Sequence, residues 1–117
     1  MRSTHSGDRE RGETTSVDGL TRSLRRVRAA QLDEIHAAIE ARQWARAGYR
    51  SATDWLTVTS REAWGQCRLT VHLAERIQAM PHVKAAFTAG DLAESALRLL
   101  ADTWSETNAA AFGRDEQ

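Results

Sequence analysis

Apolar residues recur at helical spacing along most of the chain, and the longest legible run lies between Thr59 and Pro81. At about 100° per residue, this run is apolar around most of its circumference. Its narrow polar strip consists of Arg61, Arg68, His72 and Glu75. A helix of this kind is usually enclosed by neighbours. Thr59 and Glu62 fit a capping box and Pro81 ends the run, so the pattern predicts a buried central helix.

A long first helix is predicted to begin at Asp18. Apolar residues recur there at helical spacing, namely Leu20, Leu24, Val27, Ile35, Ala38 and Ile39. The opposite face of the helix is polar and carries Arg22, Arg25, Arg26, Asp33, His36 and Glu40. The apolar period slips near residue 41, which predicts a bend or break, and Gly48 suits the C-cap.

A short helix is predicted next, because Ser51 and Asp54 form an N-cap signature. It continues through Trp55 and Leu56 until the β-branched run 57–59 interrupts it. Residues 55–59, WLTVT, also fit a strand. No second strand candidate exists for it to pair with, so we expect no sheet.

Two further helices are predicted after the central one. Pro81 suits the first position of a two-turn helix that Gly90 closes. Asp91 and Glu94 then form a third capping signature, which opens a final helix reaching about residue 108.

These elements predict an all-α fold of about five helices in one compact, orthogonal or bundle-like domain, with a long first helix and a buried central helix. The expected organisation is a disordered tail over 1–16, a helical domain over 17–108 and a C-terminal tail over 109–117. The predicted core includes Trp55, Leu56, Trp64, Cys67, Val71, Ala74, Leu99 and Leu100.

Composition limits the partners and the cellular compartment that the sequence predicts. The 117 residues carry 16 basic and 16 acidic side chains, so no net charge favours nucleic acid or a membrane surface. The single cysteine excludes an intramolecular disulfide and a cysteine-rich zinc site. The polar N-terminus lacks the apolar region of a signal peptide, and no run approaches the ~20 apolar residues of a membrane span. We therefore expect a cytoplasmic protein that does not enter a membrane.

The sequence contains no recognisable reaction chemistry. Cys67 and His72 lie five positions apart on the predicted helix, so they point about 140° away from each other and cannot form a dyad. His36, Glu40 and Asp33 share one face, but no further ligand pair lies at readable spacing, and an ion-pair face explains them better. Gly-rich phosphate loops, nucleophile elbows and HExxH motifs are absent. We expect a non-enzyme without catalytic residues, metal or cofactor.

The only local basic cluster is Arg22, Arg25, Arg26 and Arg28. Such a face could neutralise a few phosphates of DNA, although a solvated helix face has the same pattern. The segment from Phe87 to Leu100 also resembles the spacing of a helix-turn-helix with Gly90 in the turn. Its would-be reading helix, however, carries Asp91, Glu94 and Asp102 against a single arginine, which disfavours DNA.

The stretch from Gly48 to Leu92 resembles the domain of unknown function 222, a helical domain that precedes an HNH endonuclease domain in many actinobacterial proteins. The resemblance covers about residues 20–105. The matching positions are Gly48, Ser51, Trp55, Leu56, Glu62, Ala63, Leu73, Ala74, Met80, Pro81, Ala86, Gly90 and Leu92.

The resemblance implies association with nuclease-type proteins without cleavage. The family's nuclease part supplies clustered histidines and Asp or Asn as metal ligands and base. The histidines here are scattered, at His5, His36, His72 and His82. The family pattern also often has Ser and His early in the last helix, where this chain has residues Ala93 to Ala96.

Two functional hypotheses follow. The first is a non-catalytic helical module that associates with nucleic acid through Arg22–Arg28. The second is a protein-interaction or oligomerisation domain without nucleic-acid contact. Four tryptophans are many for so small a domain, and they suggest an apolar surface that binds a partner.

Overall fold

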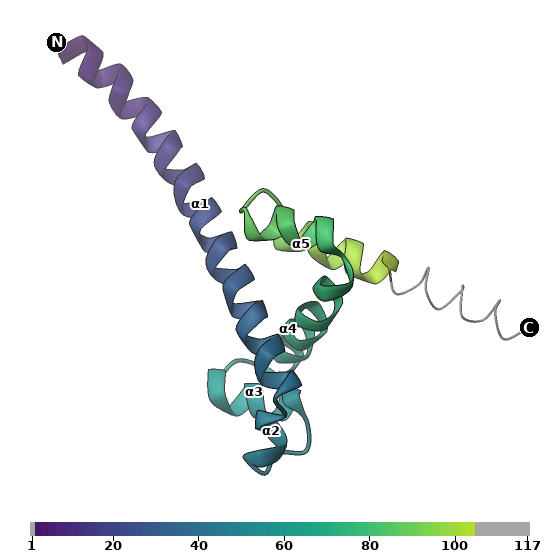
Figure 1. Ribbon diagram of the computed structural model, residues 1–117. Helices are drawn as coiled ribbons and strands as arrows, with labels where there is room; N and C mark the ends of the chain where they lie inside the picture. The colour runs from purple at the N-terminus through teal and green to yellow at the C-terminus, as the bar shows by residue number, and fades with distance from the viewer. Residues whose placement is uncertain (1, 105–117) are drawn as a thin grey trace, which may run out of the picture.

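The computed structural model describes residues 2–104, with side chains from residue 16, and it is all-α over that range. Figure 1 shows a long first helix with shorter helices gathered beside its C-terminal half. The helices are α1 (Arg2–Glu40), α2 (Gln43–Arg46), α3 (Ala52–Ser60), α4 (Trp64–Arg76), the 3₁₀ turn η1 (Ile77–Ala79) and α5 (Pro81–Thr88). A final helix begins at residue 94 and is described to residue 104. The predicted fold class is confirmed, whereas the predicted C-terminal tail lies outside the described residues.

Helix α1 differs from its prediction at one end and agrees at the other. It begins at Arg2, so residues 2–16 are helical where the sequence predicts a disordered tail over 1–16. Helical hydrogen bonds join backbone groups and need no apolar side chains, which is why the hydrophobic pattern does not mark this start. The break predicted near residue 41 is confirmed, since Arg42 adopts a left-handed φ of 55° between α1 and α2.

The predicted N-cap of α3 is confirmed, because the Ser51 hydroxyl accepts from the Asp54 backbone N–H at 3.1 Å. The predicted interruption by the β-branched run is wrong, and α3 continues to Ser60. Thr57 Oγ1 donates to the carbonyl of Thr53 at 2.8 Å. The hydroxyl is therefore satisfied inside the helix and does not compete with it.

The start predicted for the central helix is also wrong. Thr59 lies within α3, and Arg61 ends that helix in a left-handed conformation with φ 61°. Helix α4 begins only after Ala63, which has extended backbone and no side-chain cap. The Ser60 hydroxyl accepts from the Glu62 backbone N–H at 3.3 Å, but this bond lies in the corner before α4 and does not cap that helix. One predicted helix is thus two, joined by a tight corner.

The remaining signals have mixed outcomes. Pro81 occupies the first turn of α5, as predicted. Gly90 has the expected positive φ, at 85°. The final helix begins at residue 94, and the carboxylates of Asp91 and Glu94 pair with arginines of α1.

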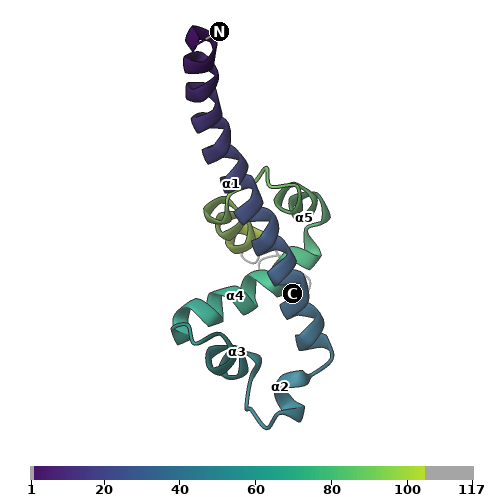
Figure 2. The ribbon, with the colours of Figure 1, turned by 90° about the vertical axis from the view of Figure 1, so that its left-hand side faces the viewer.

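The core lies where α1, α4, α5 and the final helix meet. Its largest fully buried side chains are Phe87, Leu32, Leu73, Ile77, Leu97 and Cys67. Helix α4 packs against both α1 and α3, so it is the central helix of the domain. Figure 2 shows α1 projecting beyond this assembly, and the molecule measures 70 × 39 × 21 Å along its principal axes.

The predicted core is correct in its centre and wrong at its edges. Leu56, Cys67 and Ala74 are buried, and Trp55 and Val71 pack against the core. Three predicted core residues are exposed, namely Trp64, Leu99 and Leu100. Trp64 lies at the first turn of α4, where the corner after α3 leaves it open, and the final helix turns Leu97 and Ala101 inward instead.

Substituting Gly90 tests how closely the turn after α5 packs against the backbone of Arg22. A Cβ at this position would lie 3.0 Å from the Arg22 carbonyl oxygen, and φ is already left-handed. Gly90→Ala should therefore lower the free energy of unfolding by about 2–3 kcal/mol in a denaturant titration. The matched control is Gly48→Ala, with φ 89° and open space around the Cβ, for which about 1 kcal/mol is expected. Equal losses would contradict close packing at Gly90.

Candidate functional site

The four arginines predicted to contact nucleic acid all have hydrogen-bond acceptors within the chain. Three of them reach the turn 89–91 that follows α5, and we call these contacts the arginine clamp. The clamp arginines are Arg22, Arg25 and Arg26. The fourth, Arg28, reaches the final helix and α4. The sequence leaves DNA binding and a solvated surface as alternatives for these arginines, and in the structure they contact other parts of the chain.

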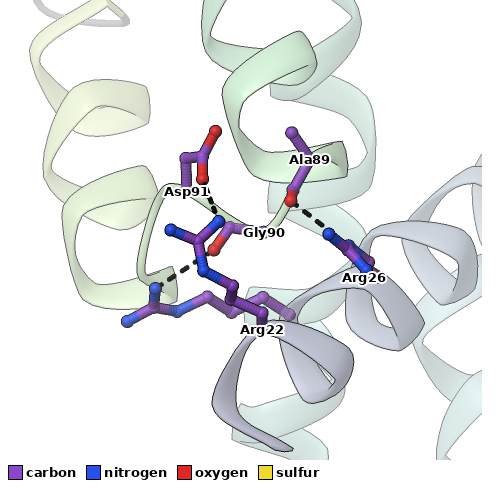
Figure 3. A network of polar contacts seen from close by, with 6 residues as sticks. Arg22, Arg26, Ala89, Gly90 and Asp91 are labelled. Carbon is purple, nitrogen blue, oxygen red and sulfur yellow. Dashed lines mark hydrogen bonds and ion pairs between the residues drawn. The ribbon is translucent and has the colours of Figure 1, made fainter. Parts of the chain in front are cut away.

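Two clamp arginines act on backbone carbonyls (Figure 3). Arg25 Nη1 donates to the Gly90 oxygen at 3.1 Å, and Arg26 Nε donates to the Ala89 oxygen at 3.2 Å. These carbonyls lie just beyond the last residue of α5, where a helix leaves C=O groups unpaired and carries partial negative charge. A cationic N–H donor both binds an unpaired carbonyl and offsets the partial negative charge. The two arginines therefore cap the end of α5 from a neighbouring helix.

The third clamp arginine forms an ion pair. Arg22 Nη1 lies 2.5 Å from Asp91 Oδ1, and the two side chains are 52% and 54% exposed. An ion pair this exposed stabilises a fold by about 1 kcal/mol or less. Its main effect is therefore to orient the turn on α1.

Arg28 makes partly buried polar contacts with two other helices. Its Nε lies 2.5 Å from Glu94 Oε1, and its Nη2 donates to Thr70 Oγ1 at 2.9 Å. Gln31 accepts a third bond at 2.6 Å. Thr70 is the buried polar residue of α4. Arg28 therefore joins three helices through one guanidinium group.

A row of exposed apolar side chains runs along the same part of α1. Val17, Leu20, Leu24 and Val27 are 64%, 65%, 71% and 66% exposed. Steps of three, four and three residues place them on one line along the helix, as at the a and d positions of a coiled coil. We call these four residues the apolar seam. The sequence places Leu20, Leu24 and Val27 in the apolar stripe of the first helix, and the other helices cover only the C-terminal end of that stripe.

A hollow lies beside the apolar seam. It has a volume of about 180 Å³ and is lined by Leu24, Arg25, Arg28, Phe87 and Glu94. For comparison, a cavity of about 150 Å³ holds a benzene ring. The hollow therefore has room for an aliphatic side chain brought by a helix lying on the seam.

The polar strip of α4 lies at the surface, as predicted. Arg68 stacks over Trp64 at 5.8 Å from the ring centre, and His72 Nε2 lies 3.6 Å from Asp102 Oδ1. A hollow of about 310 Å³ runs past Arg68 and His72. Asp102 pairs with His72, so both positive and negative groups lie near this hollow and it favours a ligand of neither charge.

The structure does not assemble the residues considered for reaction chemistry into one site, although His36 Nε2 lies 3.9 Å from Glu40 Oε1. Cys67 is buried, with its Sγ 3.5 Å from Ser60 Oγ, while His72 faces Asp102. Asp33 pairs with Lys84 at 3.4 Å and not with the histidine on its own helix. Within the described part of the chain, no three His, Cys, Asp or Glu side chains are grouped so that they could hold a metal ion.

The segment that resembles a helix-turn-helix has its turn at Gly90, as predicted. The N-terminal end of its second helix is already engaged, because Glu94 pairs with Arg28. Asp91 in the turn pairs with Arg22. These contacts place the turn against α1.

Comparison with known proteins identifies no relative, because no family model, curated protein or solved structure matches the chain. The resemblance to the domain of unknown function 222 therefore stays a prediction. Over the range that the structure describes, no helix is both long enough and apolar enough to cross a membrane.

The apolar seam is the feature that reading from the sequence missed. Its signal is present in the chain as the spacing Val17, Leu20, Leu24 and Val27, which ends at Gln31. The same residues fit an ordinary core-facing stripe. Only the position of the neighbouring helices separates the two interpretations.

Replacing Arg28 tests its role as a junction. Arg28→Met keeps an apolar stem but removes the donors to Glu94 and buried Thr70, so the free energy of unfolding should fall by about 1–3 kcal/mol. The control is Arg98→Met on the exposed face of the final helix, where a change below about 0.5 kcal/mol is expected. Denaturant titration measures both, and an unchanged Arg28→Met variant would contradict the role.

Proposed function

We propose that this chain is a self-association module in which the apolar seam of α1 pairs with the seam of a second copy. The observation that carries the proposal is the exposure of Val17, Leu20, Leu24 and Val27 in an unbroken a/d spacing. Large apolar side chains clustered on one exposed helix face are characteristic of interaction surfaces. The proposal develops the predicted oligomerisation hypothesis.

A second copy fits the apolar seam better than a different helix does. The order valine, leucine, leucine, valine reads the same in both directions, so two seams match each other in either orientation. A two-fold interface requires such self-complementarity. Coiled coils that select a different partner use charged residues along the seam edges. The edge positions here are mostly uncharged, namely Ser16, Thr21, Ser23 and Ala30, with Arg28 the exception.

The hollow beside Leu24 supports the same proposal. In knobs-into-holes packing, each seam side chain inserts between side chains of the facing helix. The hollow offers space of about 180 Å³ on the side of the seam nearest the final helix. A second α1 lying on the seam would fill it with an aliphatic side chain.

The nucleic-acid hypothesis for Arg22, Arg25, Arg26 and Arg28 has weaker support. Each of these arginines already has an acceptor within the chain, and Asp91 and Glu94 lie beside them. A phosphate would have to displace those carboxylates or lie next to them. The chain has no net charge, so no long-range electrostatic attraction draws it toward DNA.

Sedimentation equilibrium tests the self-association. At tens of micromolar we expect a mass approaching twice the 13.0 kDa of one chain. Leu20→Glu places a charge in the seam of both copies and should weaken the dimer at least about a hundredfold. The control is Ala37→Glu, which adds the same charge at an exposed position of α1 far from the seam and should leave the dimer unchanged. A wild-type monomer, or equal effects of the two variants, would contradict the proposal.

Titration into labelled duplex DNA at about 50 mM salt tests the competing hypothesis, because phosphate contacts are strongest at low salt. We expect no saturable binding at protein concentrations where the seam is paired. Binding that falls steeply with added salt and is lost in Arg26→Gln would restore the nucleic-acid hypothesis.

A further inference from the structure

The part of α1 that carries the apolar seam receives no support from the core. Among the described residues of α1, the first buried side chain is Ala29, and residues 16–28 are exposed or half-buried. The seam therefore lies in a section of helix that the hydrophobic core does not hold in place.

Such a section needs another source of order. Residues 16–28 continue a helix that the core holds from residue 29, and a section with few buried apolar contacts opens more readily than the part in the core. Gly19 lies within the section and lowers its helix propensity further. Helical geometry is what aligns the four seam residues, so loss of helix would disperse the seam.

The arginine clamp supplies contacts at the right place. Arg22, Arg25 and Arg26 bind the turn 89–91 over the same two helical turns that carry Leu24. Gly90 also packs directly on the backbone of Arg22. Figure 3 shows the turn meeting this side of α1. The turn is itself anchored, because Phe87 before it and Leu97 after it are fully buried.

We infer that the arginine clamp keeps the seam section of α1 helical and thereby controls how strongly two copies associate. The inference rests on the proposed self-association. Clamp closure and pairing stabilise the same helical section, so each favours the other to the same extent. Arg22 and Arg26 are positioning residues, since helical spacing places them on the side of α1 opposite the seam. Arg25 holds the turn as well, but it also lines the hollow beside Leu24.

A charge exchange across the clamp separates this role from general stability. Asp91→Arg sets a second cation against Arg22 and should open the clamp. The double variant Arg22→Asp with Asp91→Arg restores an ion pair of reversed polarity. Asp102→Arg, at an exposed acid of the final helix away from the clamp, is the control for added charge.

Two readouts are needed. Amide hydrogen exchange is measured in a Leu20→Glu background, where pairing is absent and the clamp acts alone. Asp91→Arg should accelerate exchange over residues 16–28 and leave the buried half of α1, residues 29–39, unchanged. Sedimentation in the wild-type background should then show association weakened about tenfold, restored by the double variant and unaffected by Asp102→Arg.

The outcomes distinguish the two proposals. A monomeric wild type overturns the self-association together with this control of it, and the exchange data then decide alone whether the clamp orders residues 16–28. A dimeric wild type with equally strong association in Asp91→Arg overturns only the clamp. If Asp91→Arg weakens association and the double variant with Arg22→Asp does not restore it, the role of the clamp is also overturned.

Discussion

The arrangement of this protein depends on the contact between the arginine clamp and the turn after α5. Arg25 and Arg26 supply cationic donors to carbonyls at the end of α5, and Gly90 allows the turn to approach the backbone of Arg22. Because the turn lies between two helices with buried side chains, this contact fixes one side of α1 toward the domain. The apolar side of the same section is then left outside.

That orientation gives α1 two functions along its length. Toward its C-terminal end, Leu32 and Ile35 are part of the core and hold α4 and α5 in place. Toward its N-terminal end, the apolar seam lies beyond the reach of the other helices. The structure therefore combines a conventional small helical core with an uncovered helix face, and self-association is the proposed use of that face. The clamp connects the two, because it is the polar support of a section that the core does not reach.

The sequence predicts the helix caps better than it predicts which helix faces are buried, exposed or in contact with other helices. The caps at Ser51, Pro81 and Gly90 are confirmed because each depends on a few neighbouring atoms. The corner at Arg61 was not predictable in this way, since a left-handed arginine has no sequence signal. Exposure of Leu20 and Leu24 was also out of reach, because a core stripe and an interface stripe share one periodicity. The contacts of the clamp arginines were not predictable either, because their partners lie more than sixty residues away in the sequence.

The central claim, that the apolar seam pairs two copies, is tested most directly by an intermolecular distance. In a Cys67→Ser background, a nitroxide on Ser23→Cys would lie at the exposed edge of the seam and one residue from its midpoint. Helices packed through the seam have axes about 10 Å apart, so pulsed dipolar spectroscopy should find the two labels on the order of 20 Å apart in either orientation. A dimer by mass whose labels show no such short distance would contradict the account.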